Sequence, residues 1–330
     1  MDSRRCGRVA AGASVNARAV LVVSLSNIGD VILTTPVMMQ LLRHYPGAEL
    51  TVVAGPKAAG LLQGSRHVSR LVVYDKHASL RQKTVMIHEL RRRRYEAAVD
   101  LRNTLIPFLV SARHRSTLVR RHSKTLMRDR HLEVLAWMGY DVSQDPGIFE
   151  FFGSGDAENL DRKLSGAGAL CAPGVVIAAG AASERKRWPL ESYREVLRGL
   201  LNFAAGPVYL IGDAAERSYV EGLVSTEPSR IFNAAGLLTL RESAALIARA
   251  PLLLSNDSAA MHLGHELRRP VAAVFGPTWP EKYGRTGPCF RIIAPSAPSE
   301  SGGFEGVTPD RVLSACRELL EMRHAAHPVS

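Results

Sequence analysis

The sequence contains little cysteine and no long apolar run. Four cysteines are spread over 330 residues without a C-x-x-C pair, which excludes a disulfide framework and a zinc-ribbon site and is typical of a reducing compartment. No apolar run approaches the roughly 20 residues that a membrane-spanning helix needs. The apolar residues after Arg18 are better explained as a core strand than as part of a signal peptide. We therefore expect a cytoplasmic protein with a flexible extension over residues 1–18.

Two nucleotide-binding fingerprints are also missing. Neither G-x-G-x-x-G nor G-x-x-x-x-G-K-[ST] follows the first strand-like segment, so neither a dinucleotide site nor a P-loop is indicated there. The absence of the first fingerprint argues against a nucleotide-sugar epimerase or dehydrogenase. Acidic residues are in deficit as well, with 31 Asp and Glu against 42 Lys and Arg and a net charge of +11. This excess favours anionic partners, which include nucleic acid, phosphorylated sugars and an acidic membrane face.

The apolar residues that are present alternate between strand-like and helix-like segments in both halves of the chain. A hydrophobic content of 46% and a charged content of 22% describe a soluble globular protein that is long enough for two domains. We expect strands at 19–25, 49–54, 68–74, 97–101, 174–179, 207–211, 231–233, 252–255 and 271–275, and helices at 57–62, 83–94, 131–138, 190–200, 214–224, 240–250 and 261–267. This alternation predicts two Rossmann-like α/β domains, at residues 19–165 and 166–330, with a cleft between them.

The first strand leads into a short polar turn that carries an acid. In the stretch from Val22 to Leu42, the sequence SNIGD separates the apolar strand from a helix-like segment. Such a turn lies at the carboxyl edge of a parallel sheet, where open α/β folds bind ligands. Asp30 is therefore a candidate functional acid, and Gly29 beside it would let a ligand approach the backbone. The alternative, that Asp30 only caps a helix, stays open on this stretch alone.

Three loops that follow strands in the second half have the character of a phosphate site. The loop GAASERKRWP brings the backbone at Gly180 together with Lys186 between two arginines, which suits a phosphate but is also compatible with a plain charged surface. The loop SNDSAAMH places Ser258 at the start of a helix and His262 one turn later on the same face. A lone histidine on a short helix is also a common structural residue.

The loop after the strand at 207–211 contains two acids. Asp213 is equally compatible with helix capping and with a contact to ribose hydroxyl groups. Residues 113–131 carry seven Arg or Lys and one acid, Asp129. A solvated basic face and an anion-binding wall that faces the cleft are both open for this run. Because no aromatic-interleaved RNA platform or helix-turn-helix accompanies it, we do not expect nucleic acid as a partner.

Four blocks, in this order and spacing, resemble glycosyltransferase family 9, the ADP-heptose:lipopolysaccharide heptosyltransferases. The resemblance covers about residues 20–285. The four blocks are SNIGDVILTTP at 26–36, GAASERKRWP at 180–189, NDSAAMHL at 256–263 and FGPT at 275–278. Two departures from the family pattern, Ala259-Ala260 after the NDS triplet and Glu184-Arg185 before Lys186, concern the donor sugar more than the reaction.

The resemblance implies a GT-B architecture, with the acceptor in the N-terminal domain and an ADP-sugar in the C-terminal domain. It implies inverting transfer that needs neither a metal ion nor another cofactor. It also implies the following roles: Asp30 as general base; Gly180, Lys186, Asp257, Ser258 and His262 as donor and phosphate contacts; Glu216 as a ribose or nucleotide contact; and Arg113, Arg115, Arg120 and Arg121 as contacts to an anionic, lipopolysaccharide-type acceptor.

Two other functions remain to be tested. A transferase that uses another nucleotide sugar would share the fold and the base, and a non-catalytic protein that binds anionic glycans would share the cleft and the basic run. We expect a monomer, with a peripheral contact to the inner face of the inner membrane compatible with the positive charge.

Overall fold

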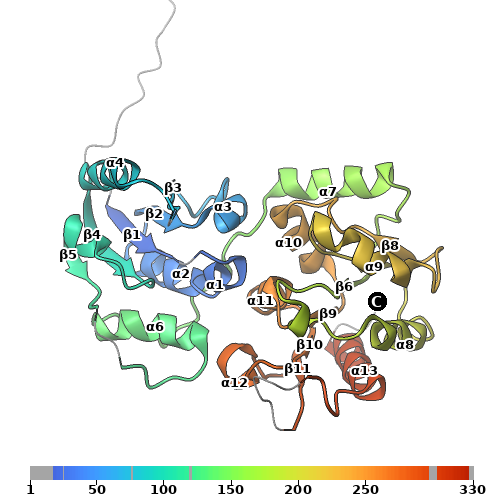
Figure 1. The fold of residues 1–330 in the computed structure, drawn as a ribbon. Helices are drawn as coiled ribbons and strands as arrows, with labels where there is room; N and C mark the ends of the chain where they lie inside the picture. Colours follow the sequence, from blue (N-terminus) through green and yellow to red (C-terminus); the bar gives the residue numbers. More distant parts are fainter. Residues whose placement is uncertain (1–17, 25, 76, 119–120, 297–302, 327–330) are drawn as a thin grey trace, which may run out of the picture.

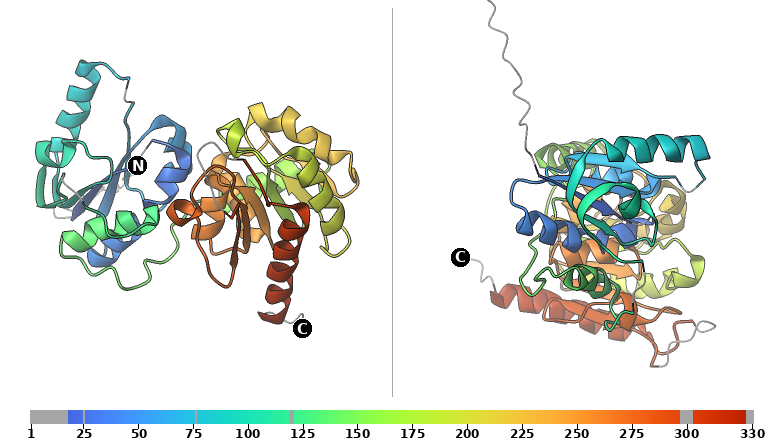
Figure 2. Two further views of the ribbon diagram at one scale, coloured as in Figure 1. Left: turned by 60° about the horizontal axis from the view of Figure 1, so that its bottom comes forward. Right: turned by 90° about the vertical axis from the view of Figure 1, so that its left-hand side faces the viewer.

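The computed structural model describes residues 18–24, 26–75, 77–118, 121–296 and 303–326. It contains two parallel sheets, each flanked by helices, in two units that lie side by side (Figures 1 and 2). The first sheet has the order β3-β2-β1-β4-β5. Its strands are β1 (Ala19–Val23), β2 (Glu49–Ala54), β3 (Arg70–Val73), β4 (Arg94–Asp100) and β5 (Ser111–Arg115).

The second sheet has the order β11-β10-β9-β6-β7-β8. Its strands are β6 (Val175–Ala178), β7 (Val208–Leu210), β8 (Ile231–Asn233), β9 (Leu253–Asn256), β10 (Val271–Val274) and β11 (Phe290–Ile293). All strand pairs in both sheets are parallel. The strand order reverses between β1 and β4 in one sheet and between β6 and β9 in the other, and such reversal points are where open α/β sheets bind ligands.

The helices connect consecutive strands and cover the sheets. They are α1 (Ile28–Ile32), α2 (Thr35–His44), α3 (Pro56–Leu62), α4 (Leu80–Arg91), α5 (Ile106–Leu109), α6 (Met127–Trp137), α7 (Ser154–Gly166), α8 (Leu190–Leu200), α9 (Arg217–Val224), α10 (Leu240–Arg249), α11 (Ala259–Glu266), α12 (Pro280–Tyr283) and α13 (Pro309–Ala326), with 3₁₀ turns at Glu184–Lys186 and Ala214–Glu216. No helix among the described residues is both long and apolar enough to cross a membrane.

The local sequence explains why these elements form. All five residues of β1 are buried, as expected for a central parallel strand that is covered on both faces. Helix α8 buries Tyr193, Val196, Leu197 and Leu200, which recur at the spacing of one helical face. Helix α10 begins with a capping box, in which Thr239 accepts from the Glu242 amide and the Glu242 carboxylate accepts from the Thr239 amide. The prediction of two Rossmann-like α/β sheets is confirmed.

Helix α7, which the sequence analysis did not predict, packs against α10 of the second unit. Lys163 pairs with Glu242 at 2.7 Å, and Asp156 pairs with Arg241 at 2.8 Å. The domain boundary at residues 165 and 166 stays a prediction. A boundary before α7 would keep these contacts within one unit.

Candidate active site

Asp30 lies in the first turn of α1, directly after β1. The cap position of this helix is held by Asn27, so the alternative in which Asp30 is the helix cap is wrong. The Asn27 side-chain amide donates to the Asp30 carboxylate at 3.0 Å. This hydrogen bond orients the carboxylate, and among the described residues the other Asp30 oxygen has no hydrogen-bond partner, so that oxygen is available to accept a proton.

The second unit contributes a lysine and a buried carboxylate from two different loops. Lys186 Nζ lies 2.6 Å from Asp257 Oδ2. The same oxygen accepts from the hydroxyl of Thr278 at 2.9 Å. The Asp257 side chain is only 4% exposed, so the lysine compensates a carboxylate that has lost most of its water. The loops after β6, β9 and β10 therefore meet at Asp257.

Asn256 explains how these loops are held together. Its side-chain oxygen accepts from the Trp188 amide at 3.3 Å and from the Tyr193 hydroxyl at 2.9 Å. Its side-chain NH2 group donates to the Ala179 carbonyl at 2.7 Å. All of these atoms are buried, so an amide side chain with both a donor and an acceptor is needed here. Asn256 fixes the loop that carries Lys186 against the end of β9.

Glu216 lies over the glycine turn that follows β6. A β-carbon at position 180 would overlap the Glu216 carboxylate, so Gly180 is required for this close approach. Asp213 and Glu216 form a reciprocal capping box, with hydrogen bonds of 2.9 and 3.0 Å, which shows that Asp213 does cap this turn. Burial raises the pKa of Glu216, and the Arg187 guanidinium at 3.9 Å acts in the opposite direction. Glu216 therefore lies beside the predicted phosphate loop.

His262 lies at the contact between the two units. It is buried on α11, and a β-carbon at position 29 would come within 3.0 Å of its Cδ2 atom. Gly29 was predicted to admit a ligand, whereas in the structure it admits His262. Burial lowers the pKa of His262 to about 4, although the carboxylates of Asp257 and Asp30 favour its protonation. His262 is therefore neutral at pH 7, and its buried Nδ1 has no hydrogen-bond partner among the residues that the structure describes.

This neutral histidine predicts a loss of stability in acid. Its folded pKa of about 4 lies below its ordinary value of 6.5, so between these values the unfolded chain binds a proton that the folded chain does not. Stability is retained above pH 6.5 and falls as the pH drops toward 4. We expect His262→Gln to reduce the loss between pH 7 and 4.5 by about 2–3 kcal/mol, measured by denaturant unfolding. The exposed His77→Gln serves as control, and a wild-type pH profile in His262→Gln would contradict the prediction.

Ser258 occupies the N-cap position of α11, and its hydroxyl lies 3.0 Å from that of Ser255. Its side chain makes no cap hydrogen bond. The hydroxyl is therefore positioned at the positive end of a helix, between β9 and His262, where an anion is favoured.

The predicted acceptor arginines lie on the first unit, and two of them are already engaged. Arg113 and Arg115 belong to the edge strand β5, on the outer side of the sheet (Figure 1). Arg113 lies 3.8 Å from Glu96, and Arg115 donates to the carbonyls of Pro107 and Val110. Arg121 is exposed on the chain after β5, and Arg120 lies outside the described residues. The structure does not place Arg113 or Arg115 in contact with Asp30, and their acceptor role stays a prediction.

Two side chains that the sequence analysis did not predict also lie at this site. Thr278 bonds Asp257, and the Tyr283 ring lies 5.8 Å from Lys186 Nζ and 6.2 Å from the His262 ring. Thr278 belongs to the FGPT block, so its position in that block was a usable signal. Tyr283, on α12, had no comparable signal.

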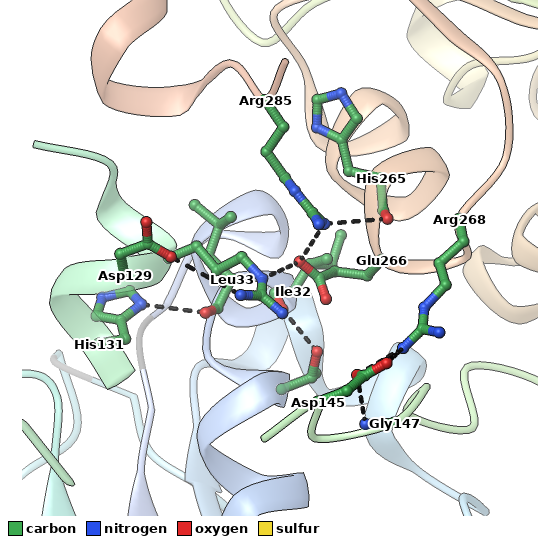
Figure 3. A network of polar contacts seen from close by, with 12 residues as sticks. Ile32, Leu33, Asp129, His131, Asp145, Gly147, His265, Glu266, Arg268 and Arg285 are labelled. Atoms are coloured by element: carbon green, nitrogen blue, oxygen red, sulfur yellow. Dashed lines mark hydrogen bonds and ion pairs between the residues drawn. The ribbon is translucent and has the colours of Figure 1, made fainter. Parts of the chain in front are cut away.

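A partly buried ionic network, which sequence reasoning also missed, joins the two units beside a cavity of about 630 Å3. Figure 3 shows Arg285 directed at Glu266 and Arg268 directed at Asp145. Arg128 of α6 donates to the same Glu266 oxygen at 2.8 Å. Burial lowers the pKa of Arg285, and the nearby Glu266 raises it. The network fixes the C-terminal end of α11, whose N-terminal end carries Ser258.

Within the described part of the chain, no three or more His, Cys, Asp or Glu side chains are grouped as a metal site would require.

Comparison with solved structures supports the fold that this arrangement indicates. A structure of ADP-heptose LPS heptosyltransferase II from Escherichia coli superimposes with a TM-score of 0.75 at 23% identity, covering 93% of this chain and 99% of that one. A family 9 glycosyl transferase from Veillonella parvula gives a TM-score of 0.76 at 22% identity, with the same coverage. Two Rossmann-like units with facing carboxyl edges define a GT-B fold.

Sequence comparisons show which family the chain is similar to. Residues 155–297 match the model described as glycosyltransferase family 9 (heptosyltransferase). Lipopolysaccharide heptosyltransferase 2 of Salmonella typhimurium is 26% identical over 91% of this chain and 98% of its own length. Over these residues the chain is similar to glycosyltransferase family 9, and the protein is a glycosyltransferase enzyme.

Proposed function

We propose that the protein transfers heptose from an ADP-sugar to a lipopolysaccharide-core acceptor, with inversion at the anomeric carbon and without a metal ion. Support for the substrates comes from the relatives, whose names specify lipopolysaccharide heptosyltransferases over nearly the whole chain. The transferase hypothesis also accounts for the placement of an acid, Asp30, on one unit and a cation, Lys186, on the other.

The single observation that carries this proposal is the contact between Gly29 and His262. It brings the helix that carries Asp30 against the helix that begins at Ser258. A general base and a phosphate-binding helix terminus on opposite sides of a domain interface are what a transfer between two bound substrates needs. A protein that only binds glycans has no need for such an acid.

In the proposed reaction, Asp30 takes the proton of the acceptor hydroxyl as that oxygen forms a bond to the anomeric carbon. The bond from this carbon to the diphosphate oxygen breaks at the same time, and ADP leaves with the electron pair. A carboxylate serves as general base when it lies within hydrogen-bond reach of the hydroxyl group. Because attack comes from the face opposite to the departing ADP, the configuration inverts.

The negative charge that develops on ADP is met by groups of the second unit. Lys186 provides the cation, and Asp257 holds its ammonium group in place at 2.6 Å. Ser258 and neutral His262 provide polar groups at the N-terminus of α11. Glu216, beside Gly180, is positioned to accept from ribose hydroxyl groups.

A panel of nucleotide sugars tests this proposal and the alternative donors. We expect ADP-heptose to stabilise the protein by about 2.7 kcal/mol at 100 times its Kd, and UDP- and GDP-sugars to have smaller effects at equal concentration. Lys186→Ala should abolish the shift, whereas the neighbouring Arg185→Ala serves as a control. Equal or larger stabilisation by a UDP- or GDP-sugar would overturn the donor assignment. Stabilisation without any turnover would favour the non-catalytic glycan-binding protein.

A further inference from the structure

The cations of the predicted phosphate loop are largely compensated by acids of the same unit. Lys186 Nζ lies 2.6 Å from Asp257 Oδ2, and the Asp257 side chain is only 4% exposed. Arg187, the next residue, lies 3.9 Å from Glu216. Each pair has no net charge while its carboxylate is ionised. A diphosphate that departs as an anion needs positive charge that no carboxylate already cancels, and these two pairs do not supply it.

Helix α12 brings a further lysine to the same place. Lys282 Nζ lies 5.2 Å from the centre of the Tyr283 ring, and Lys186 Nζ lies 5.8 Å from the same centre. Among the residues that the structure describes, no carboxylate forms an ion pair with Lys282. The ring attracts both ammonium groups, but the two positive charges repel each other. An anion bound beside both lysines would remove this repulsion.

The backbone that carries Lys282 is fixed to the site. Thr278, two residues before α12, donates to Asp257 Oδ2 at 2.9 Å. The buried Pro280 occupies the first position of the helix, and the Lys282 amide donates to the Trp279 carbonyl at 3.1 Å. The start of α12 is therefore held against the loop that carries Asp257, and Lys282 extends from an anchored turn.

The order of groups along the site indicates which phosphate lies nearest to Lys282. Glu216, the proposed ribose contact, lies beside the glycine turn after β6. Tyr283 lies toward the other unit, because its ring is 6.2 Å from the ring of His262, and His262 packs against the helix that carries Asp30. A donor with its ribose at Glu216 and its sugar toward Asp30 has its β-phosphate at the Tyr283 end.

We propose that Lys282 is a catalytic residue that contacts the β-phosphate of the donor and, with Lys186, neutralises the charge that develops on departing ADP. This inference rests on the proposed function, because it takes the donor to be an ADP-sugar. An ammonium group without a carboxylate partner forms charge-assisted hydrogen bonds to a diphosphate. These bonds are strongest when the bond from the sugar to the β-phosphate oxygen breaks and the electron pair stays on that oxygen.

Calorimetry of ADP and AMP binding tests the contact with purified full-length protein. We expect Lys282→Gln to raise the Kd for ADP by roughly tenfold, and to leave the Kd for AMP, which lacks the β-phosphate, within about twofold. Lys282→Arg keeps the positive charge and should restore most of the affinity for ADP. The matched control is Arg317→Gln on α13, which removes a cation 4.8 Å from the centre of the Phe203 ring. It should leave both Kd values within about twofold.

Single-turnover transfer at saturating donor tests the catalytic part of the proposal. Lys282→Gln should lower the rate by roughly 10²-fold, and Lys282→Arg should recover most of it. Wild-type ADP affinity or wild-type turnover in Lys282→Gln would overturn the proposal. So would a loss of affinity that AMP shares or that Lys282→Arg does not restore, because either result would show a structural effect of α12. Absence of ADP binding in the wild type would overturn the proposed function, and this inference with it.

Discussion

Asp30→Asn is expected to lower kcat by a factor of roughly 10² to 10⁴, while the Kd for ADP stays within a few fold. The asparagine keeps the size of the side chain and a carbonyl oxygen for the Asn27 amide, which donates to Asp30 at 3.0 Å. It removes the basic oxygen that would take the acceptor proton. The measurement is single-turnover transfer with saturating donor, alongside calorimetry of ADP binding.

The matched control is Asp75→Asn. Asp75 is an exposed acid just after β3, at the same edge of the same sheet, and it accepts from the His77 amide. Its substitution should leave kcat within about twofold, because it lies two strands away from β1. Near wild-type turnover in Asp30→Asn, with an unchanged melting temperature, would eliminate Asp30 as the base and require another acceptor of the proton.

Much of the fold could be predicted from the sequence because its central strands carry a strong local signal. β2 and β8 and helix α8 were predicted with the observed bounds, since apolar runs or helical spacing are bounded there by turn residues. The edge strand β5 was missed because its sequence, SARHR, alternates with charges that face solvent. Helices α7 and α13 were also missed, although α13 buries Val312, Cys316 and Leu319 at helical spacing.

The candidate site could be predicted in part. Asp30 and the loop that carries Lys186 each follow a buried strand, so the rule that parallel strands present ligands at their carboxyl edge was enough to select them. Asp257 was predicted only from the resemblance to glycosyltransferase family 9. The packing of Gly29 on His262 could not be predicted, because it depends on how two separate units are placed. The same holds for Glu266, which appeared in the sequence only as one acid near the end of a helix.

Glu266→Gln is expected to destabilise the protein by about 3–5 kcal/mol, the usual cost of removing one partner from a buried ion pair. The Glu266 side chain is 8% exposed, and one of its oxygens accepts from Arg128 at 2.8 Å and from Arg285 at 3.3 Å. Its neutralisation removes the buried carboxylate that both guanidinium groups contact, and Arg128 keeps only the more exposed Asp129 at 3.8 Å as an ion-pair partner among the described residues. The measurement is the unfolding free energy from denaturant titration, followed by probes in each unit.

The control for this substitution is Glu318→Gln. Glu318 pairs with Arg291 at 3.0 Å, but its side chain is 53% exposed, so its loss should cost at most about 1 kcal/mol. If Glu266→Gln were no more destabilising than Glu318→Gln, the network around Glu266 would contribute no more to the free energy of unfolding than a surface ion pair does.

Arg128 and Arg285 allow the stabilisation that crosses between the two units to be measured apart from the stabilisation within the second unit. Arg128 lies on α6 of the first unit, whereas Arg285 belongs to the second unit with Glu266. In a double-mutant cycle, Arg128→Met combined with Glu266→Gln should cost less than the sum of the two single changes, by about 1–3 kcal/mol. Because this pair crosses the interface, Arg128→Met should also weaken the contact that holds His262 against Gly29. We therefore expect Arg128→Met to lower kcat as well as stability, whereas Arg285→Met should lower stability with a smaller effect on kcat.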